Sequence, residues 1–541
     1  MKGLIASLIL TAASAALCLA QSAGNPEDSG LMPRTPTFYI NTNYYNNGSG
    51  ESPGVAIAAN GNVLIGWEDD GTSIVDFEAV WSLFDGNGNL LTPPTVITNF
   101  DGTASVTNTY LSYFRPNGTA TPGAYAFGPK IKANLFGNGI GMGASASDPI
   151  GSEITYLGAI NEDDGGFGGF PAVQTLNNDG TPAGAMGVLT GVSDADAQPT
   201  GSIRIGDWDY LSNGNIVIVN ESRQNDDLVN RFGGTAAGNH ATFRIVTPAG
   251  AEVKSYSLVS ATPTANSIWH GAGVTSNGFA VRFNSGGTTV RMFDNAGNRT
   301  TGDINLATLT GIAGTGDGGR GDGTGFHGNG KDAYVYVNSS GGEVYVTVLN
   351  ADGSLRYARN VADPGDTIAA NRVDGAIAPD GRVIAVWESP LPNARGDVTN
   401  RLVQARLFNA SGQPLGGRFV VSEWENPANT NTVNTSEIPR VAWRSNTIAI
   451  TWLSQNAPTS LSDPLGHPRV IAARLFTVVD LVPSTTLSIS KSGTDIRITW
   501  EGGGKLESAP DLTGSWTEVV GAASPFTVQP TGSRKFYRVS L

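Results

Sequence analysis

The sequence predicts an all-β protein: a seven-bladed β-propeller followed by a small C-terminal β-sandwich-like module. Two repeated features carry this prediction. Seven short turns each open a stretch of alternating apolar residues, and a second turn of fixed form follows tens of residues later. A strand-built repeat with a period above about 40 residues is typical of a propeller. Glycine supplies 71 of the 541 residues, as a protein with many tight turns requires.

The opening turns mostly combine asparagine or aspartate with glycine: Ala59–Gly61, Gly137–Gly139, Ser212–Gly214, Ser276–Gly278, Gly330–Asp332, Pro379–Gly381 and Arg444–Asn446. The second turns consist of an apolar residue, three mostly polar residues and a glycine: Phe84–Gly88, Leu176–Gly180, Val246–Gly250, Phe293–Gly297, Leu349–Gly353 and Phe408–Gly412. The seventh unit, after Phe476, lacks the glycine. Runs such as Val383–Trp387 alternate with period two, which indicates strands.

The chain divides into four expected segments. Residues 1–20 have the basic start, apolar stretch and small-residue cleavage site of a secretory signal peptide, with cleavage expected after Ala20. Residues 21–36 are small, polar and proline-containing, and we expect a flexible lead-in. The propeller is expected over residues 37–480. The C-terminal β-module is expected over 485–541, where four or five short strands follow one another.

Charge and cysteine content restrict the partners and the compartment. The net charge is −14 and the isoelectric point is about 4.8, which disfavours nucleic acid and anionic membrane surfaces. The only cysteine, Cys18, lies in the expected signal peptide, so the mature chain has no thiol chemistry and no disulfide. We expect a secreted protein, extracellular or at the cell surface, with no membrane span in the mature chain.

Two segments resemble known bacterial sequences. The segment Asp380–Glu388 with Leu402–Leu415 has an acidic-Gly turn, a strand ending in tryptophan, an Arg-x-Phe strand and a Gly-x-Pro-Leu turn. It resembles a degenerate propeller-type repeat of large secreted bacterial proteins. The C-terminal residues 506–508, 511–516 and 536–539 resemble a short β-module common on bacterial exported proteins. The resemblance implies export or surface presentation and supplies no functional residues.

The candidate site lies where the chain enters the innermost strands. These segments face the central channel of a propeller, and they contain a mixed set of bases and acids: Lys132, Asp207, His270, His327, Arg372, Asp374 and Arg440. Such a ring suits binding of a small anion or sugar acid, or acid–base chemistry. The alternative is that these residues form structural ion pairs around the axis. Both interpretations stay open at the level of sequence.

Aromatic side chains near the strand entries are candidates for stacking on sugar rings. They include Trp208 and Trp269, together with Tyr44, Tyr45, Tyr210 and Trp424. Half-buried packing at the strand entries explains them equally well.

No motif indicates an organic cofactor, and the identity of any metal stays unknown. Acidic clusters at Glu68–Gly71, Glu162–Gly165 and Asp317–Asp322 make calcium a candidate, although none has the spacing of a calcium loop. A Gly-x-Ser-x-Gly elbow, a phosphate loop, a His-Glu-x-x-His motif and the Ser-x-Asp-x-Gly-x-Thr-Trp box of sialidase-type propellers are all absent from the sequence.

These observations favour a secreted binding or surface-interaction protein, with extracellular polysaccharide or cell-surface glycan as the first ligand class. Two alternatives remain. One is an extracellular polysaccharide lyase or glycoside hydrolase that acts at the channel mouth, and the other is a non-catalytic surface-display protein. An enzyme predicts that His270, His327 and Arg372 converge on one cavity.

Overall fold

The computed structural model describes most of the chain in segments: residues 24–40, 50–69, 78–96, 125–147, 170–183, 187–188, 203–222, 240–248, 251–259, 270–285, 287–312, 325–363, 368, 370, 372–390, 401–422, 436–454, 470–479, 487–500, 505–511, 514–530 and 534–540. Almost all of the secondary structure in them is antiparallel sheet. The chain separates into two compact units, Met1–Val478 and Val479–Leu541.

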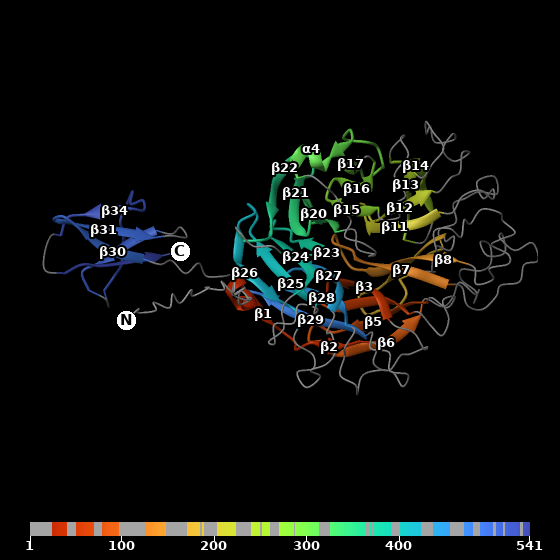
Figure 1. Cartoon of the computed structure of the whole chain (residues 1–541), viewed down its shortest axis with the longest axis horizontal. Helices are drawn as coiled ribbons and strands as arrows, with labels where there is room; N and C mark the ends of the chain where they lie inside the picture. Colours follow the sequence, from red (N-terminus) through yellow and green to blue (C-terminus); the bar gives the residue numbers. More distant parts are fainter. Residues whose placement is uncertain are drawn as a thin grey trace, which may run out of the picture. The chain divides into compact units, whose positions relative to one another are not determined.

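Within the described residues, the first unit contains seven sheets, which we number 1 to 7 in chain order (Figure 1). Sheet 1 consists of β3 (Gly50–Ile57), β4 (Val63–Asp69), β5 (Glu78–Phe84) and β6 (Leu90–Val96). Sheet 2 consists of β7 (Tyr125–Ala133), β8 (Ile140–Ser147), β9 (Phe170–Leu176) and β10 (Gly187–Val188). Sheet 3 consists of β11 (Ile203–Tyr210), β12 (Ile216–Ser222), β13 (His240–Val246) and β14 (Glu252–Leu258).

The next three sheets repeat the same four-strand order. Sheet 4 has β15 (Gly271–Thr275), β16 (Gly278–Asn284), β17 (Thr288–Asp294) and β18 (Ile304–Asn305), followed by α4 (Leu306–Thr310). Sheet 5 has β19 (Phe326–Gly328), β20 (Ala333–Ser340), β21 (Glu343–Asn350) and β22 (Leu355–Asn360). Sheet 6 has β23 (Val373–Ile377), β24 (Val383–Pro390), β25 (Arg401–Phe408) and β26 (Pro414–Val420).

Sheet 7 combines the two ends of the first unit. Its strands β27 (Ser436–Arg444), β28 (Thr447–Ser454) and β29 (Val470–Val478) come from the end of the unit, and β1 (Leu31–Pro33) and β2 (Phe38–Tyr39) come from its beginning. Both N-terminal strands pair antiparallel with β29. The structure therefore places part of the expected flexible lead-in, residues 31–33, inside a sheet. The sequence does not reveal so short a strand, because it forms only against its partner from the far end of the unit.

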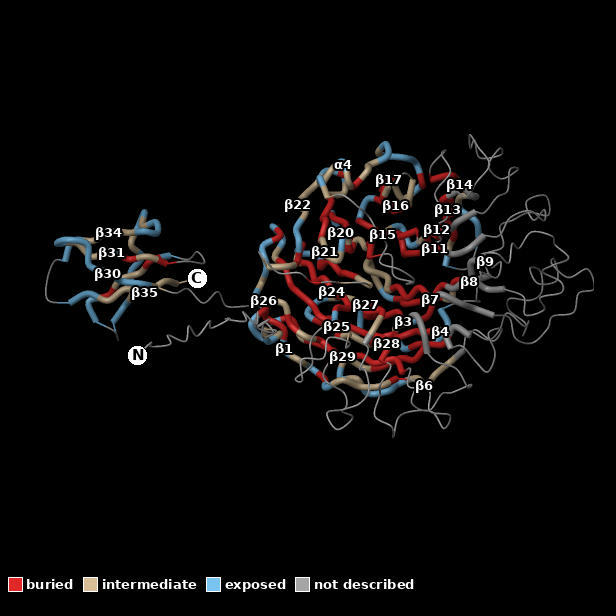
Figure 2. The backbone as a smooth tube through the Cα atoms, viewed as in Figure 1, coloured by how far each residue is buried: buried red, intermediate tan, exposed pale blue. Residues whose placement is uncertain are grey.

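The first strands of the seven sheets form a closed ring. Each contacts the first strand of the next sheet, in the order β3, β7, β11, β15, β19, β23 and β27, and β27 contacts β3. The sheets surround this ring in Figure 1, and Figure 2 shows that their inner and middle strands are largely buried. The opening turns of the sequence connect first to second strands, and the second turns connect third to fourth strands.

The glycine of the second turns has two structural roles. Gly412, in the second turn of sheet 6, has a φ of 79°, a conformation that other residues adopt only with strain. A Cβ atom at this position would lie 2.6 Å from Cδ2 of Tyr357 in sheet 5. The turn thus packs on the preceding sheet only because residue 412 has no side chain.

Buried arginines connect neighbouring sheets. Arg406 of β25 donates from Nη1 to the carbonyl oxygen of Val361 over 2.6 Å, and Val361 directly follows the outermost strand of sheet 5. Arg474 of β29 donates over 3.2 Å to the carbonyl oxygen of Val421, which follows the outermost strand of sheet 6. Arg291 of β17 makes the equivalent contact with Val259 after sheet 3. These arginines hold consecutive sheets together where no backbone ladder can.

The N-terminal segment connects three sheets. The amide of Gly24 donates over 2.8 Å to the carbonyl oxygen of Arg418 in sheet 6. The short helix η1 (Pro26–Ser29) follows. Leu31 of β1 is fully buried in the core between sheets 6 and 7. The ring of Phe38 lies 5.3 Å from that of Phe84 in sheet 1, centroid to centroid. The segment therefore closes the ring by joining sheets 6, 7 and 1.

In its described segments, the second unit contains two three-stranded sheets. One contains β30 (Leu487–Ser492), β31 (Asp495–Trp500) and β34 (Phe526–Val528), and the other contains β32 (Lys505–Ala509), β33 (Thr517–Glu518) and β35 (Phe536–Ser540). Ile498 and Trp500 of the first sheet and Leu506 of the second share one small core. In the parts of the chain that the structure describes, no helix is long and apolar enough to cross a membrane.

Ring closure by β1 gives a test of the fold. Leu31→Ala removes a fully buried side chain from the core between sheets 6 and 7, and we expect the free energy of unfolding to fall by about 2–5 kcal/mol. Met32→Ala in the same strand is the matched control, because Met32 is 46% exposed, and we expect a change of less than about 1 kcal/mol. Chemical denaturation measures both. Equal effects of the two variants would contradict closure through Leu31.

Candidate functional site

Residues of the first strands and of several opening turns line a cavity of about 310 Å³, which we call the central cavity. Its polar lining comes from Lys132, Asp209, His327, Asn329, Arg444 and Ser445. The rest of the lining is mainly apolar and includes Ile57, Ile131, Ile377 and Trp443. The polar side chains come from sheets 2, 3, 5 and 7, so the complete ring is needed to assemble them.

A buried ion pair supports one side of the central cavity. Lys132 of β7 donates from Nζ to Oδ2 of Asp207 in β11 over 2.9 Å. The same oxygen accepts the backbone amide of Ala272 from sheet 4, also over 2.9 Å. Burial lowers the pKa of Lys132, but Asp207 and its neighbouring carboxylates outweigh this and raise the pKa above its usual value. Lys132 is therefore a fixed cation that links sheets 2, 3 and 4.

A second contact of the same form links sheets 5, 6 and 7. Nε2 of His327 in β19 lies 2.8 Å from Oδ1 of Asp374 in β23. Oδ2 of Asp374 accepts the backbone amide of Val441 in β27 over 3.0 Å. Burial raises the pKa of Asp374, but the imidazole of His327, the Arg440 charge and the Val441 amide together hold it below its usual range. Asp374 thus stays ionised and orients the imidazole.

Asp209 is the carboxyl group that the sequence analysis missed. It is 5% exposed, and its Oδ1 accepts the backbone amide of Tyr210 over 2.8 Å. Burial raises the pKa of Asp209 to about 7, although the nearby Lys132 charge lowers it. Asp207 contributes a further rise in the pKa. The carboxyl of Asp209 therefore changes its charge near neutral pH while it lines the central cavity.

The local sequence explains how two aspartates reach the centre of the ring. Asp207 and Asp209 are two residues apart in β11, so they lie on the same side of the strand. The register of β11 shifts between Ile205 and Asp207, and the residue between them is Gly206. A Cβ atom at Gly206 would lie 2.8 Å from Cβ of His270 in the next sheet. The bulge and the glycine allow β11 to approach sheet 4 closely. Because Asp209 follows Asp207 by two residues in a strand, the alternation of side chains could have identified it from the sequence.

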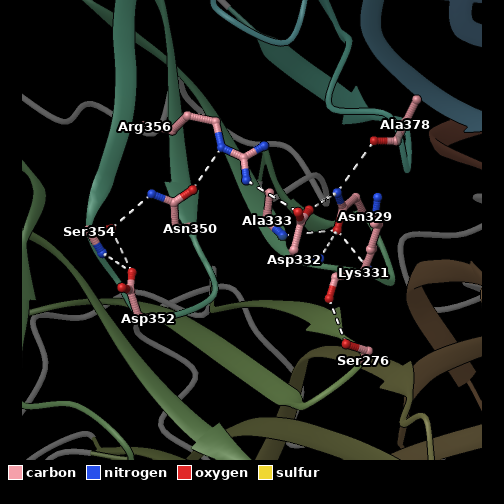
Figure 3. A network of polar contacts seen from close by, with 10 residues as sticks. All are labelled: Ser276, Asn329, Lys331, Asp332, Ala333, Asn350, Asp352, Ser354, Arg356 and Ala378. Carbon is pink, nitrogen blue, oxygen red and sulfur yellow. Dashed lines mark hydrogen bonds and ion pairs between the residues drawn. The ribbon is translucent and has the colours of Figure 1, made fainter.

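Asn329 fixes the turn after β19, the short strand that contains His327, and Figure 3 shows its contacts there. Its Oδ1 accepts the backbone amides of Lys331, Asp332 and Ala333 over 2.8 to 3.0 Å, which fixes the turn after β19. Its Nδ2 donates to Oδ1 of Asp332 over 3.0 Å. Nδ2 also donates over 3.5 Å to the carbonyl oxygen of Ala378, which follows β23 of the next sheet. Asn329 thus fixes the turn after His327, and its own polar atoms are occupied.

Arg444 connects the two ends of the ring across the central cavity. Its Nη1 donates to the carbonyl oxygen of Asn134 over 2.8 Å, and its Nη2 donates to that of Gly137 over 3.0 Å. A longer contact of 3.4 Å reaches the carbonyl oxygen of Ile57. The guanidinium of sheet 7 therefore fixes the opening turn of sheet 2 and contacts sheet 1. Arg444 belongs to an opening turn, and nothing in its place in the sequence indicates that it lines the cavity.

The other predicted residues lie away from the cavity lining. His270 is fully buried, neither ring nitrogen has a partner within the described residues, and burial with the Arg282 charge lowers its pKa to about 3. Arg372 donates to Glu437 over 2.9 Å. Arg440 is buried and donates to the carbonyl oxygen of Pro439 over 2.7 Å. His270, His327 and Arg372 therefore do not line one cavity, since His327 alone of the three does so.

Trp208 has a structural position and not the exposed one that sugar stacking requires. It is fully buried between sheets 2 and 3, where its Nε1 donates over 2.7 Å to the carbonyl oxygen of Lys130. The expectation of a ligand-binding Trp208 is corrected accordingly: the alternating pattern of β11 turns residue 208 away from Asp207 and Asp209 and into the core. Trp269 lies outside the described residues.

The structure gives no support to a particular metal. Within the described segments, no group of three or more His, Cys, Asp or Glu side chains could hold a metal ion. Of the acidic clusters considered for calcium, Glu162–Gly165 and Asp317–Asp322 lie entirely outside those segments, as do the last two residues of Glu68–Gly71.

No family model and no curated protein matches this chain. Among solved structures, a protein of unknown function from Dyadobacter fermentans is 12% identical, with a TM-score of 0.40, over 83% of this chain and 100% of that one. A Hadza microbial sialidase is 13% identical, with a TM-score of 0.39, over 80% of this chain and 66% of the sialidase. The Pyrococcus horikoshii acylaminoacyl peptidase is 9% identical, with a TM-score of 0.39, over 86% of this chain and 59% of the peptidase.

The two central aspartates are expected to have opposite effects on stability. The pKa of Asp209 is about 7 in the folded protein, against 3.8 for the free side chain. The folded state thus binds this proton more tightly, and its stability falls as the pH rises from about 4 to about 7. Asp209→Asn keeps a side-chain oxygen that accepts the backbone amide of Tyr210, and it removes the carboxyl group that titrates. We expect its free energy of unfolding to rise relative to that of the wild type by up to about 4 kcal/mol between about pH 4 and about pH 7. Above about pH 7 we expect no further rise.

Asp207→Asn is the matched comparison, because it leaves Lys132 buried without its counter-charge. We expect it to lose about 3–5 kcal/mol of unfolding free energy at pH 7. Thermal denaturation of both variants and the wild type between pH 4 and pH 8 measures the two effects. If the stability of Asp209→Asn and that of the wild type changed in parallel with pH, the raised pKa of Asp209 would be contradicted.

Proposed function

We propose that this chain is a secreted, seven-bladed β-propeller that binds a small polar ligand in its central cavity, with carbohydrate as the ligand class. The observation that carries the proposal is the cavity itself. About 310 Å³ lies at the lower end of the size range of small-molecule sites, and it suits one sugar unit. Lys132, Asp209 and His327 provide polar groups, and the remaining walls are mainly apolar.

Pre-organisation supports binding at this place. Lys132 and His327 are each held by a buried aspartate that also accepts a backbone amide of the following sheet. A ligand would meet side chains that are already oriented, so little conformational entropy is lost on binding. Carbohydrate fits such a site because a sugar ring combines hydroxyl groups with apolar C–H faces.

A second candidate function is a polysaccharide lyase or glycoside hydrolase. One observation favours it: the carboxyl of Asp209, with a pKa of about 7, could exchange a proton with a substrate at neutral pH. His270 and Arg372 do not join Asp209 in the cavity lining, which leaves this candidate behind the binding function. Release of reducing or unsaturated ends from a polysaccharide would identify the enzyme.

A cavity-filling variant tests the binding function. Ala133 lines the central cavity, and Ala133→Leu reduces the space without changing any charge. We expect the purified mature chain, residues 21–541, to bind members of a glycan array, and Ala133→Leu to abolish this binding.

Ala296→Leu is the matched control, because Ala296 is exposed in the second turn of sheet 4, and we expect its binding to be unchanged. Thermal denaturation confirms that each variant is folded. Binding that survives in Ala133→Leu would place the ligand elsewhere. Failure of the wild type to bind any glycan would overturn the carbohydrate proposal and favour surface display.

Export is tested separately. We expect the full chain, produced in a bacterium, to leave the cytoplasm with Gln21 as its first residue, because residues 1–20 have the pattern of a signal peptide. N-terminal sequencing of the exported protein measures this, and a chain lacking residues 2–20 is the control that stays inside. An exported protein that retains residues 1–20 would contradict cleavage after Ala20.

A further inference from the structure

Charges around the central cavity are mostly neutralised by neighbours within the fold. Lys132 is paired with Asp207, and His327 is paired with Asp374. Arg444 donates to backbone carbonyl oxygens, and Asp209 is the acidic side chain of the described lining without such an ion pair. Its Oδ1 accepts one backbone amide, and within the described residues its Oδ2 has no hydrogen-bond or ion-pair partner. The side chain is 5% exposed and lines the cavity, so a group inside the cavity is the natural partner of Oδ2.

We propose that Asp209 and Lys132 form a subsite for two adjacent hydroxyl groups of a neutral sugar. This inference rests on the function proposed above and names its substrate class. One hydroxyl donates a hydrogen bond to Asp209, and its neighbour accepts one from Lys132. Nζ of Lys132 has three N–H donors and bonds one described residue, Asp207, so it retains donors for a ligand.

The balance of charge selects a neutral sugar over charged ones. A sugar acid would bring a carboxylate near Asp209 and the carboxylates of Asp207 and Asp374, all of which act on Lys132. An amino sugar would bring an ammonium group near Lys132 and the guanidinium of Arg444. Like charges in a buried site repel strongly. A neutral diol donates to the acid and accepts from the base without adding a charge.

His327 and the apolar walls complete the recognition of a sugar. The contact between Nε2 and Asp374 fixes the imidazole, and Nδ1 has no partner in the described part of the chain. Because the side chain is 27% exposed and lines the cavity, Nδ1 is available for a third hydroxyl. Ile57, Ile131 and Ile377 provide an apolar surface for the C–H face of the ring.

Binding in this subsite depends on pH in a defined direction. The groups that act on Asp209 are Lys132 of β7, Asp207 in its own strand and His327 of β19, and the amide of Tyr210 bonds it. An ionised carboxylate accepts a hydroxyl hydrogen bond more strongly than a protonated one. The pKa of Asp209 is about 7, so affinity rises as the pH passes through about 7 and levels off above it.

The experiment uses titration calorimetry on the mature chain at pH 5.5, 7 and 8.5. The probes are the methyl glycosides of glucose, galactose, mannose and xylose, their deoxy counterparts lacking one hydroxyl of each adjacent pair, methyl glucuronide and glucosamine. We expect at least one neutral glycoside to bind about tenfold or more tightly than its deoxy counterpart. We also expect it to bind more tightly than glucuronide and glucosamine.

Two variants separate this inference from the broader function. Asp209→Asn is expected to weaken binding of the preferred glycoside by about tenfold to a hundredfold at pH 8.5 and to remove the pH dependence. Asp179→Asn is the control, because Asp179 lies in an exposed turn of sheet 2, and its binding should match the wild type.

Wild-type affinity and pH dependence in Asp209→Asn would overturn the subsite and leave sugar binding in the cavity intact. A preference for glucuronide or glucosamine over every neutral glycoside would likewise overturn only the neutral-sugar inference. If no glycoside binds and the glycan array is also negative, the proposed function fails together with the subsite.

Discussion

The ring depends on contacts between sheets, because neighbouring sheets share no backbone ladder along most of their length. Inside each sheet, backbone hydrogen bonds align the strands. Neighbouring sheets are held together by apolar packing and by a few buried polar side chains. Asp207 and Asp374 each accept a backbone amide from the next sheet while they hold a base of the preceding one. Towards the outside, Arg406 and Arg474 donate to a carbonyl oxygen of the preceding sheet. Buried polar groups at the sheet boundaries are therefore satisfied in two ways. Near the centre, aspartates accept backbone amides, and further out, arginines donate to backbone carbonyl oxygens.

This arrangement joins two interpretations that the sequence kept apart. The bases and acids at the strand entries were expected either to bind a ligand or to form structural ion pairs. Lys132 and His327 do the second and line the cavity as well. A base that is held by a buried aspartate is rigid and keeps a free face towards the cavity. The contacts that close the ring therefore also orient the lining of the cavity, and a ligand that bound there, as we propose, would gain from order that folding has already provided.

The sequence predicts well what depends on local patterns and poorly what depends on distant partners. Turn glycines and period-two strands specify the order of strands, because each needs only its neighbours in the chain. Lys132, Asp207, His327 and Asp374 could be placed at the strand entries because they occupy similar places in their units. The strand at Leu31 was missed because it pairs with β29, more than four hundred residues later. Trp208 was misplaced for a different reason: residue type alone does not say which side of a strand is buried.

Under the proposed binding function, stability and binding oppose each other at Asp209. Burial raises the pKa of Asp209, so its carboxyl weakens the fold as the pH rises towards neutrality, whereas Asp207 and Asp374 each bond a neighbouring base and a backbone amide. An apolar residue or an asparagine at position 209 would stabilise the empty ring. A ligand hydroxyl that donates to Asp209 would recover part of this cost, and by linkage it would lower the pKa of the carboxyl. The ring is therefore expected to be more stable with its ligand than without it, and the difference should be largest above pH 7, where the free carboxylate is least well accommodated.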